Sequence, residues 1–404
     1  MRPTASQIRP PDVDHVARSA TEDARALFDE HFERGATSAW TTYQQAPMAI
    51  QADHTHYSEG FALFAAMPYG VAIAARRVSG VGRVAEEGAP ARVAVPFEAT
   101  PRPDDSIAVR IVRSVLNACT EPPPALNMAI VDSLPDSCQD AYAVALARAV
   151  YLALNHFARK DEKAPPFTGA SFTQIARAAL PEALGLPYST AYPLAVSAAS
   201  HQNGRLAPFL LVDTPAREVI PVPSSHAPSL QWGFFDAGPP AQETPDVHYT
   251  RKQQVREALD ALQQTEDFAD LASFNTLEHR SLDRALNLVG PPHQAVVRHL
   301  VTENRRVQKH VVALRHGDGQ MTGALLHMTH TSLQTVWQGT TAAADFLVQH
   351  AEQYTEAGLY GAGMTGRNGY VLTIGRVPTY RNHIETLAER YESAFHHSVS
   401  FLPL

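Results

Sequence analysis

The sequence predicts a protein of mixed helices and strands that is divided into about two domains. With 404 residues, the chain is longer than a single hydrophobic core usually requires. Short apolar stretches bounded by glycine or proline, which favour strands, alternate with longer stretches of helical periodicity. A proline-rich segment at 221–245 interrupts the chain, and we place the domain boundary there, giving domains at 15–222 and 223–404.

The expected helices share an apolar stripe at helical spacing. They lie at 17–32, 106–118, 141–157, 171–180, 252–262, 281–288, 292–314, 321–333, 342–357 and 376–394. The helix at 171–180 is expected to stop before Pro181. The expected strands are short and apolar, and they lie at 69–77, 91–96, 125–131, 231–235, 370–374 and 398–402.

Composition excludes several classes of function. A content of 45% hydrophobic and 18% charged residues is that of an ordinary globular protein. A net charge of −8 without a basic cluster argues against nucleic acid or an anionic membrane as partner. Cys119 and Cys138 are the only cysteines, and the 19 histidines show no H-E-x-x-H spacing, so we expect no disulfide framework and no metal site. Because no signal peptide or membrane-spanning run is evident, we expect the cytoplasm.

A cluster of polar residues separates two apolar arms, at 46–50 and 60–66. It contains a carboxylate, two imidazoles, hydroxyls and a phenol, supplied by Asp53, His54, Thr55, His56, Tyr57, Ser58 and Glu59. Such groups suit recognition of a polyhydroxylated ligand, and binding residues concentrate on loops that a rigid scaffold positions. A polar surface turn without a ligand explains the same stretch equally well.

Three segments carry a family resemblance. Residues 46–67, APMAIQADHTHYSEGFALFAAM, resemble the galactokinase signature of the GHMP kinase superfamily, A-P-G-R-V-N-L-I-G-E-H-x-D-Y-N-x-G-F-V-L-P-M-A. Residues 298–318, RHLVTENRRVQKHVVALRHGD, resemble R-x-x-H-V-x-x-E-N-x-R-V…A-L-x-x-G-D. Residues 358–374, GLYGAGMTGRNGYVLTI, resemble G-A-x-G-A-R-M-T-G-x-G-F-G-G-C-x-x-x-L.

The resemblance covers residues 46–404 and implies an α+β fold of two domains. The N-terminal domain would be of the ribosomal S5 domain 2-like type and the C-terminal domain ferredoxin-like, with the ligand cleft between them. The activity that the resemblance implies is phosphorylation of a sugar with ATP and Mg²⁺.

The resemblance also implies site residues. Those assigned to the sugar are Asp53, His54, His56, Tyr57 and Tyr249, the last from HYTRK at 248–252, which resembles Y-N-x-R-R. Those assigned to the nucleotide lie in a glycine-rich loop and are Gly361, Met364, Thr365, Gly366 and Gly369. Two structural alternatives stay open: Tyr249 as an aromatic at a helix entry, and the glycines as residues of a tight turn.

Three parts of the family's phosphate chemistry are missing. The G-R-V-N arginine has no counterpart, since Met48 or Ala49 stands in its place. The aspartate of M-D-Q, which faces the sugar hydroxyl that is phosphorylated, falls at Ser197, and no acid lies between Glu182 and Asp213. A serine of normal pKa cannot take the hydroxyl proton.

The third missing part is the glycine loop that cradles phosphates. Residues 132–140, DSLPDSCQD, occupy its place without a glycine and with three aspartates. We expect Asp136 or Ser137 to cap the following helix, with Asp140 in its first turn. Backbone N–H groups would then be satisfied by side chains, and the carboxylates would repel a triphosphate by about 1 kcal/mol or more each.

The sequence supports three hypotheses. The first is a catalytically impaired galactokinase relative, a pseudokinase with a regulatory role or a role in binding a sugar or a related metabolite. The second is an active ATP-dependent sugar-1-kinase with Asp213 or Asp53 as base and Arg205 or Lys252 as phosphate partner. The third is a different reaction in the same cleft that uses His54 and His56, because neighbouring imidazoles titrate near neutrality.

Overall fold

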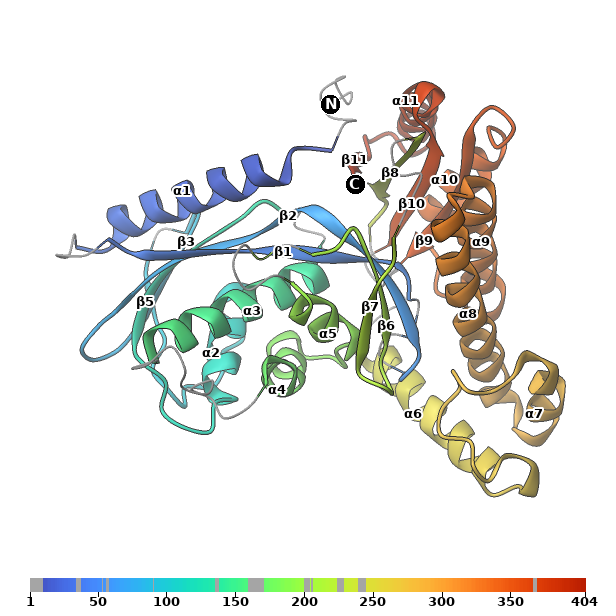
Figure 1. Ribbon diagram of the computed structural model, residues 1–404, viewed down its shortest axis with the longest axis horizontal. Helices are drawn as coiled ribbons and strands as arrows, with labels where there is room; N and C mark the ends of the chain where they lie inside the picture. Colours follow the sequence, from blue (N-terminus) through green and yellow to red (C-terminus); the bar gives the residue numbers. More distant parts are fainter. Residues whose placement is uncertain are drawn as a thin grey trace. The chain divides into compact units, whose positions relative to one another are not determined.

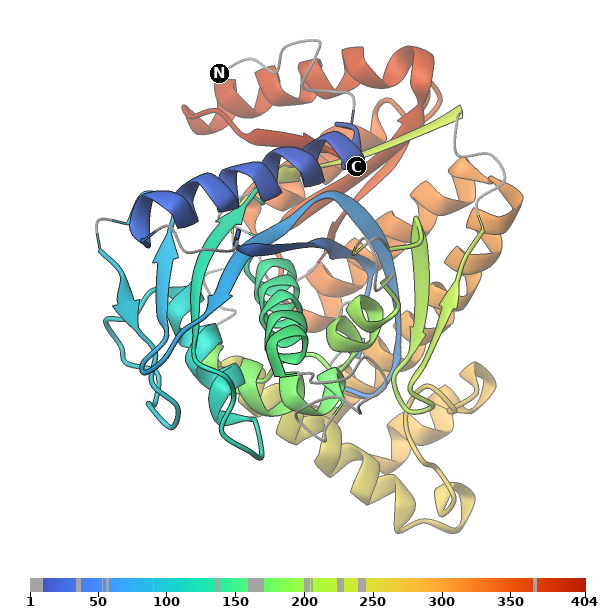
Figure 2. The ribbon, with the colours of Figure 1, turned by 60° about the vertical axis from the view of Figure 1, so that its left-hand side comes forward.

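The computed structural model describes residues 10–33, 38–52, 54–55, 58–89, 91–134, 138–158, 171–199, 204, 206–223, 229–238, 245–365 and 369–404. Helices and strands both occur throughout, which confirms the α+β class (Figures 1 and 2). The chain forms two compact units. We call Pro11–Met48 with Ala66–Leu206 the N-terminal unit, and Ala49–Ala65 with Ala207–Leu404 the C-terminal unit. The boundary between residues 222 and 223 stays a prediction.

The N-terminal unit is built on antiparallel and parallel strand pairs. Its strands are β1 (Trp40–Gln51) and β2 (Phe61–Arg77), which both continue into the C-terminal unit, and β3 (Arg83–Glu86), β4 (Val93–Ala94) and β5 (Leu126–Asp132). Their order is β4-β3-β5-β2, with β1 also paired to β2 and with β3 and β5 parallel. The apolar arm at 60–66 and the strand expected at 69–77 are thus one strand.

Helices cover both faces of these strands. They are α1 (Val13–His31), α2 (Ile107–Asn117), α3 (Gln139–Ala158), α4 (Phe172–Leu184) and α5 (Ala191–Ser197). Figure 1 shows α1 along one face and α2–α5 on the other. The helix α1 begins after Asp12, whose carboxylate accepts hydrogen bonds from two backbone N–H groups of the first turn, and it buries Ala24 and Phe28 against Ala72 and Ala129.

The expected end of the helix before Pro181 is wrong. Pro181 lies inside α4, which continues to Leu184 and ends at Gly185, a residue in the left-handed conformation with φ 68°. Pro181 sits in the last turn, so its ring removes a single hydrogen bond near the helix end. Burial of Leu180 and Ala183 on either side of the proline keeps this last turn packed.

The C-terminal unit contains a four-stranded antiparallel sheet of order β11-β8-β10-β9. Its strands are β8 (Leu230–Asp236), β9 (Leu359–Thr365), β10 (Tyr370–Arg376) and β11 (Ser400–Pro403). In the same unit, the first residues of β2 pair with β6 (Phe209–Asp213), which pairs with β7 (Glu218–Pro221). Phe61 stands opposite Asp213 in this pairing.

The helices of the C-terminal unit pack on that sheet and on one another. They are α6 (Pro245–Gln263), α7 (Leu282–Leu288), α8 (Pro291–His316), α9 (Gly319–Ser332), α10 (Ala342–Glu352) and α11 (Val377–Phe395). Both α9 and α10 pack against β9. The end of α9 runs into a π-helical turn, Leu333–Trp337. No helix in the described part of the chain is long and apolar enough to cross a membrane.

The glycine-rich segment at 358–369 is mainly strand and not loop, which corrects our expectation. Leu359–Thr365 is β9, and Met364 and Thr365 are buried in it. A Cβ atom on Gly361 would lie 2.4 Å from the carbonyl oxygen of Gly323 in α9. The glycines of this strand therefore allow a helix backbone to approach closely, a use that needs no ligand.

Candidate functional site

The turn that contains His54 is the best defined part of the predicted sugar site. It lies between β1 and β2, and we call the described residues 54–55 and 58–60 the His54 turn. The Thr55 hydroxyl donates to the Phe61 carbonyl at 2.6 Å, and the N–H groups of Ser58 and Gly60 donate to the Thr55 carbonyl at 3.2 and 3.0 Å. His54 adopts the left-handed conformation with φ 60°, which a histidine rarely takes and which surrounding contacts must maintain.

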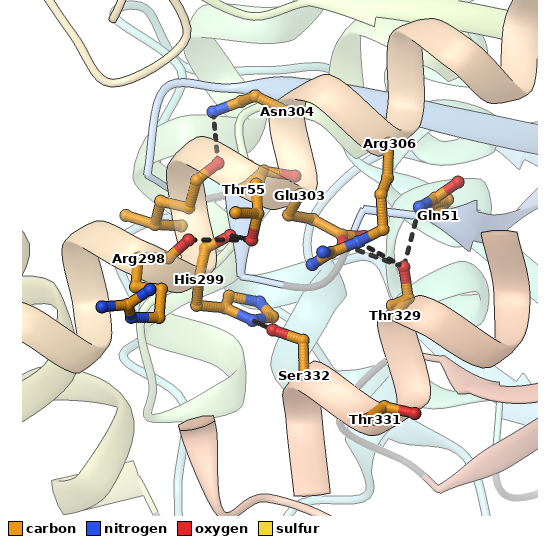
Figure 3. A network of polar contacts seen from close by, with 12 residues as sticks. Gln51, Thr55, Arg298, His299, Glu303, Asn304, Arg306, Thr329, Thr331 and Ser332 are labelled. Carbon is orange, nitrogen blue, oxygen red and sulfur yellow. Dashed lines mark hydrogen bonds and ion pairs between the residues drawn. The ribbon is translucent and has the colours of Figure 1, made fainter. Parts of the chain in front are cut away.

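A side chain of α8, Asn304, anchors the His54 turn; Figure 3 shows Asn304 near Thr55. Asn304 accepts a hydrogen bond from the Phe61 N–H at 2.7 Å through Oδ1 and donates through Nδ2 to the Leu300 carbonyl at 2.9 Å. Gly60 passes so close that a Cβ atom there would lie 2.6 Å from Asn304 Oδ1 and 2.8 Å from Thr55 Cβ. The turn and the helix are therefore fitted to each other at van der Waals contact.

An aromatic cluster holds the ring of His54. The imidazole stacks on the indole of Trp337 with ring centres 3.8 Å apart and 19° between the planes. His299 of α8 lies edge-on to His54 at 5.6 Å, and its Nδ1 lies 2.9 Å from the Ser332 hydroxyl. Arg251 of α6 places its guanidinium 4.9 Å from the centre of the Trp337 ring and donates to the Trp337 carbonyl at 3.2 Å. We call these four residues, His54, His299, Trp337 and Arg251, the His54 cluster.

A second, fully buried network fixes the end of β1 (Figure 3). Gln51 donates to the Thr329 hydroxyl at 2.7 Å, and the hydroxyl donates to Glu303 at 2.9 Å. Arg306 pairs with the same carboxylate at 2.7 Å. Gln51 Oε1 lies 2.5 Å from Nδ1 of His310, and burial lowers the pKa of His310 to about 3, so this imidazole is neutral. These charges compensate one another inside the protein and are not exposed to a ligand.

The remaining predicted sugar residues divide into two groups. Tyr249 is described and lies on α6, two residues before Arg251, with half of its side chain exposed. Asp53, His56 and Tyr57 lie outside the described residues. Their assignment to a sugar, like that of Tyr249, stays a prediction.

The residues predicted to bind nucleotide lie in or next to the β9–β10 hairpin. Gly361, Met364 and Thr365 belong to β9, and the Thr365 hydroxyl donates to the Ala49 carbonyl at 3.1 Å. Gly369 precedes β10 with φ 76°, a value that favours glycine. Gly366 lies outside the described residues. Their contact with a nucleotide, and the cleft predicted between the domains, stay predictions.

The residues that the family resemblance aligns with catalytic groups are Ser197 and Met48 or Ala49. Ser197 ends α5, and its hydroxyl donates to the Pro193 carbonyl at 2.7 Å. Met48 and Ala49 are buried in β1. A hydroxyl of this kind, a thioether and a methyl group do not ionise at neutral pH.

The segment between β5 and α3 contains no glycine, and its described acids are engaged locally. Asp132 ends β5 and accepts a hydrogen bond from the Leu134 N–H at 3.0 Å. Asp140 is buried in the first turn of α3. The expected caps, Asp136 and Ser137, lie outside the described residues. A carboxylate in the first helical turn occupies the electrostatic position that a phosphate would use, so these residues do not fit the phosphates of ATP.

The sequence did not point to the aromatic partners of His54. Trp337 lies in QTVWQGTTAAAD (334–345), where the chain departs from the family's D-Y-E-V-S-C-P-E-L-D. A large aromatic residue in a divergent segment was the available signal. Asn304 lies in the T-E-N-R part of the α8 motif, which we used for fold and not for the site. Among the described residues, no group of three or more His, Cys, Asp or Glu side chains could hold a metal ion.

Comparisons with known proteins agree with this architecture. No protein-family model matches the chain. A galactokinase from Mannheimia succiniciproducens is 24% identical over 378 residues, which cover 91% of this chain and 93% of that protein. A galactokinase from Roseiflexus sp. is 31% identical over 146 residues, and this match spans only 36% of either protein.

Solved structures extend the similarity over the whole chain. Lactococcus lactis galactokinase complexed with galactose superposes with a TM-score of 0.78 at 19% identity, covering 96% of this chain and 97% of that one. Methanococcus jannaschii mevalonate kinase superposes with a TM-score of 0.58 at 10% identity, over 91% and 98% of the two chains. The fold is therefore that of the GHMP kinases. In sequence and in fold, the chain is galactokinase-like.

Proposed function

We propose that this protein binds a monosaccharide at the His54 turn and has lost most of its capacity for phosphoryl transfer. The observation that carries the proposal is the contrast between an ordered His54 turn and the replacement of the family's catalytic aspartate by Ser197, whose hydroxyl is already bonded to the Pro193 carbonyl. Ground-state hydrogen bonds to sugar hydroxyls do not require the missing groups, whereas phosphoryl transfer depends on charge stabilisation.

The expected loss of rate is large. Removal of one electrostatic contributor typically costs about a hundredfold to a thousandfold in rate. Three contributors are replaced here: the arginine by Met48 or Ala49, the aspartate by Ser197, and the glycine loop by residues 132–140. We therefore expect Mg-ATP to bind weakly or not at all, because the segment lacks glycines and carries carboxylates where phosphates would lie.

A sugar is the ligand class that the turn supports. The structural neighbour from Lactococcus lactis is a complex with galactose, and the polar residues at 53–59 of this chain provide donors and acceptors for hydroxyls. A galactose-like sugar is therefore the first ligand to test. A regulatory role follows if the sugar binds without turnover.

The deciding experiment measures binding and turnover on the same protein. Thermal unfolding with galactose and a panel of other monosaccharides should reveal a stabilising sugar, by about 2.7 kcal/mol at a hundredfold excess over Kd. ADP release with Mg-ATP and that sugar should equal the buffer control. ADP release that depends on one sugar would overturn the proposed loss of activity, and no stabilisation by any sugar would overturn the binding role.

An active sugar kinase is the second candidate, and one observation favours testing it. Asp213 ends β6 in register with Phe61, the residue that follows the His54 turn, which supports Asp213 as the base of this second candidate. Its Oδ1 accepts a hydrogen bond from the Ala216 N–H at 3.2 Å. If sugar-dependent ADP release is found, Asp213→Asn should abolish it and Ser197→Ala should not.

A further inference from the structure

A polar pocket of about 500 Å³ lies in the C-terminal unit on the surface of α8. One wall comes from the chain around the 3-10 turn His279–Ser281 and the other from two turns of α8. The polar residues that line it carry amide, guanidinium and imidazole groups and include Asn275, His279, Arg280, Asn304, Arg305 and Gln308. The volume suits a small metabolite.

The described lining has an excess of positive charge. Arg280 forms an ion pair with Glu278, the only carboxylate among the described lining residues. Arg305 donates to the neutral amide of Gln308 at 3.1 Å and has no carboxylate partner within the described ranges. A guanidinium has five N–H donors, and its planar fork can bind a planar or tetrahedral oxyanion with two parallel hydrogen bonds.

One wall of the pocket also anchors the His54 turn. Asn304 lines the pocket, is 4% exposed, and holds the Phe61 N–H at 2.7 Å. Arg305 is its neighbour on α8. A ligand held by Arg305 would therefore contact Asn304, the side chain that fixes the end of the turn. Gly60 packs directly against Asn304, so a shift of the Asn304 side chain would be transmitted to the turn.

We propose that this pocket binds a small metabolite that carries an oxyanion, either a phosphate or a carboxylate, and that its occupation tightens the His54 turn through Asn304. The site does not depend on sugar binding at the turn or on any phosphoryl transfer. A ligand in this pocket would regulate the predicted sugar site through Asn304, which contacts both the pocket and the turn. The competing explanation is that Arg305 is an ordinary solvated surface charge.

Titration calorimetry tests the site with inorganic phosphate and succinate as probes, at constant ionic strength with chloride as reference. The full-length chain is compared with Arg305→Gln and with the matched control Lys309→Gln, which removes one positive charge from an exposed position of the same helix that is not among the lining residues. We expect Arg305→Gln to weaken binding about tenfold or more and Lys309→Gln to change it less than about twofold. Preference for phosphate or succinate identifies the class of oxyanion.

Two outcomes would overturn the site. Equal weakening in both variants would mean diffuse surface charge, and absence of binding above chloride would mean that the pocket has no anion selectivity. The link to the turn is tested by hydrogen exchange, where the bound probe should slow exchange of the amides at residues 58–61 in the parent chain and not in Arg305→Gln. Unchanged exchange with the probe bound would remove the proposed coupling, whatever the result with sugars.

Discussion

The His54 turn and the segment between β5 and α3 stand where the family resemblance assigns sugar and phosphate, and they are built in opposite ways. At the turn, the Thr55 hydroxyl and the Asn304 amide of α8 form hydrogen bonds with backbone groups of Phe61, and the indole of Trp337 stacks on the imidazole of His54. In the other segment, Asp132 turns its carboxylate back onto a neighbouring N–H, and Asp140 is buried at the helix start. In the described residues of the first region, side chains fix the backbone of a turn, whereas in those of the second, one carboxylate bonds to a neighbouring N–H and another is buried at a helix start.

This difference underlies the proposal that sugar binding is retained while phosphoryl transfer is lost. A turn that is held by packing keeps its shape without a nucleotide. A phosphate loop has no function once its backbone donors are occupied or its glycines are replaced.

Removal of the indole of Trp337 should have the largest effect. Trp337→Ala leaves a cavity next to His54 and removes the ring on which the Arg251 guanidinium lies. We therefore expect the free energy of unfolding to fall by about 3–5 kcal/mol. Binding of the stabilising sugar should weaken about tenfold or more, as measured by calorimetry. Trp337→Phe keeps an aromatic face and should retain most of the affinity. Full affinity in the alanine variant would show that the cluster does not position the turn.

Acid should destabilise the C-terminal unit through its buried histidines. Burial lowers the pKa of His310 to about 3 and that of His330 to about 4, whereas an unfolded histidine titrates near 6.5. The unfolded chain therefore binds more protons in this window, and stability is lost as the pH falls through 6.5. For each histidine, the free energy of unfolding changes with a slope that approaches about 1.4 kcal/mol per pH unit. The free energy of unfolding measured with urea should therefore be about 3 kcal/mol lower at pH 5 than at pH 6.5.

A control variant isolates the contribution of His310. His310→Asn preserves a donor toward Gln51 and removes the titrating ring, so the pH slope should fall by about half. His397→Gln, at an exposed position near the chain end, should leave the slope unchanged. An unaltered slope in His310→Asn would assign the acid sensitivity to other groups.

The contact between Gly60 and α8 should tolerate no added methyl group. Gly60→Ala places a Cβ 2.6 Å from Asn304 Oδ1, and we expect a loss of about 1–3 kcal/mol in stability. Gly290→Ala, where the nearest heavy atom would be 3.8 Å from the new Cβ, is the matched control and should cost less than about 1 kcal/mol. Comparable losses in both variants would contradict the close fit of the turn against Asn304.

The smallest expected effect concerns the phosphate side. Replacement of Asp132 and Asp136 by glycine removes two carboxylates without creating the conformation that cradles phosphates. Relief of about 1 kcal/mol of repulsion per carboxylate should raise the affinity for Mg-ATP about thirtyfold at most, without producing tight binding. Calorimetric titration of the double variant and the parent chain measures this. Micromolar affinity in the variant would show that charge alone closes the site, and micromolar affinity in the parent would overturn the comparison itself.

The sequence predicted the elements better than it predicted the contacts between them. The helix expected at 292–314 is α8, Pro291–His316, because its apolar periodicity is long and glycine ends it. Pro181 and the glycines of β9 misled us, because helix breaking and loop formation depend on position and on what packs nearby. The stacking of His54 on Trp337 joins residues far apart in the sequence, and no local pattern encodes such a pair.

The π-helical turn at Leu333–Trp337 makes the length of the chain at this point matter as much as its composition. A π-helical turn contains about one residue more than an α-helical one. Deletion of a single residue within it would restore an ordinary helix and rotate the residues after the deletion by about 100°. Trp337 would then leave the face that meets His54 although no atom of the indole had changed. Gain or loss of one residue here would therefore disrupt the His54 cluster as thoroughly as a substitution of Trp337, and relatives should be compared by spacing as well as by identity.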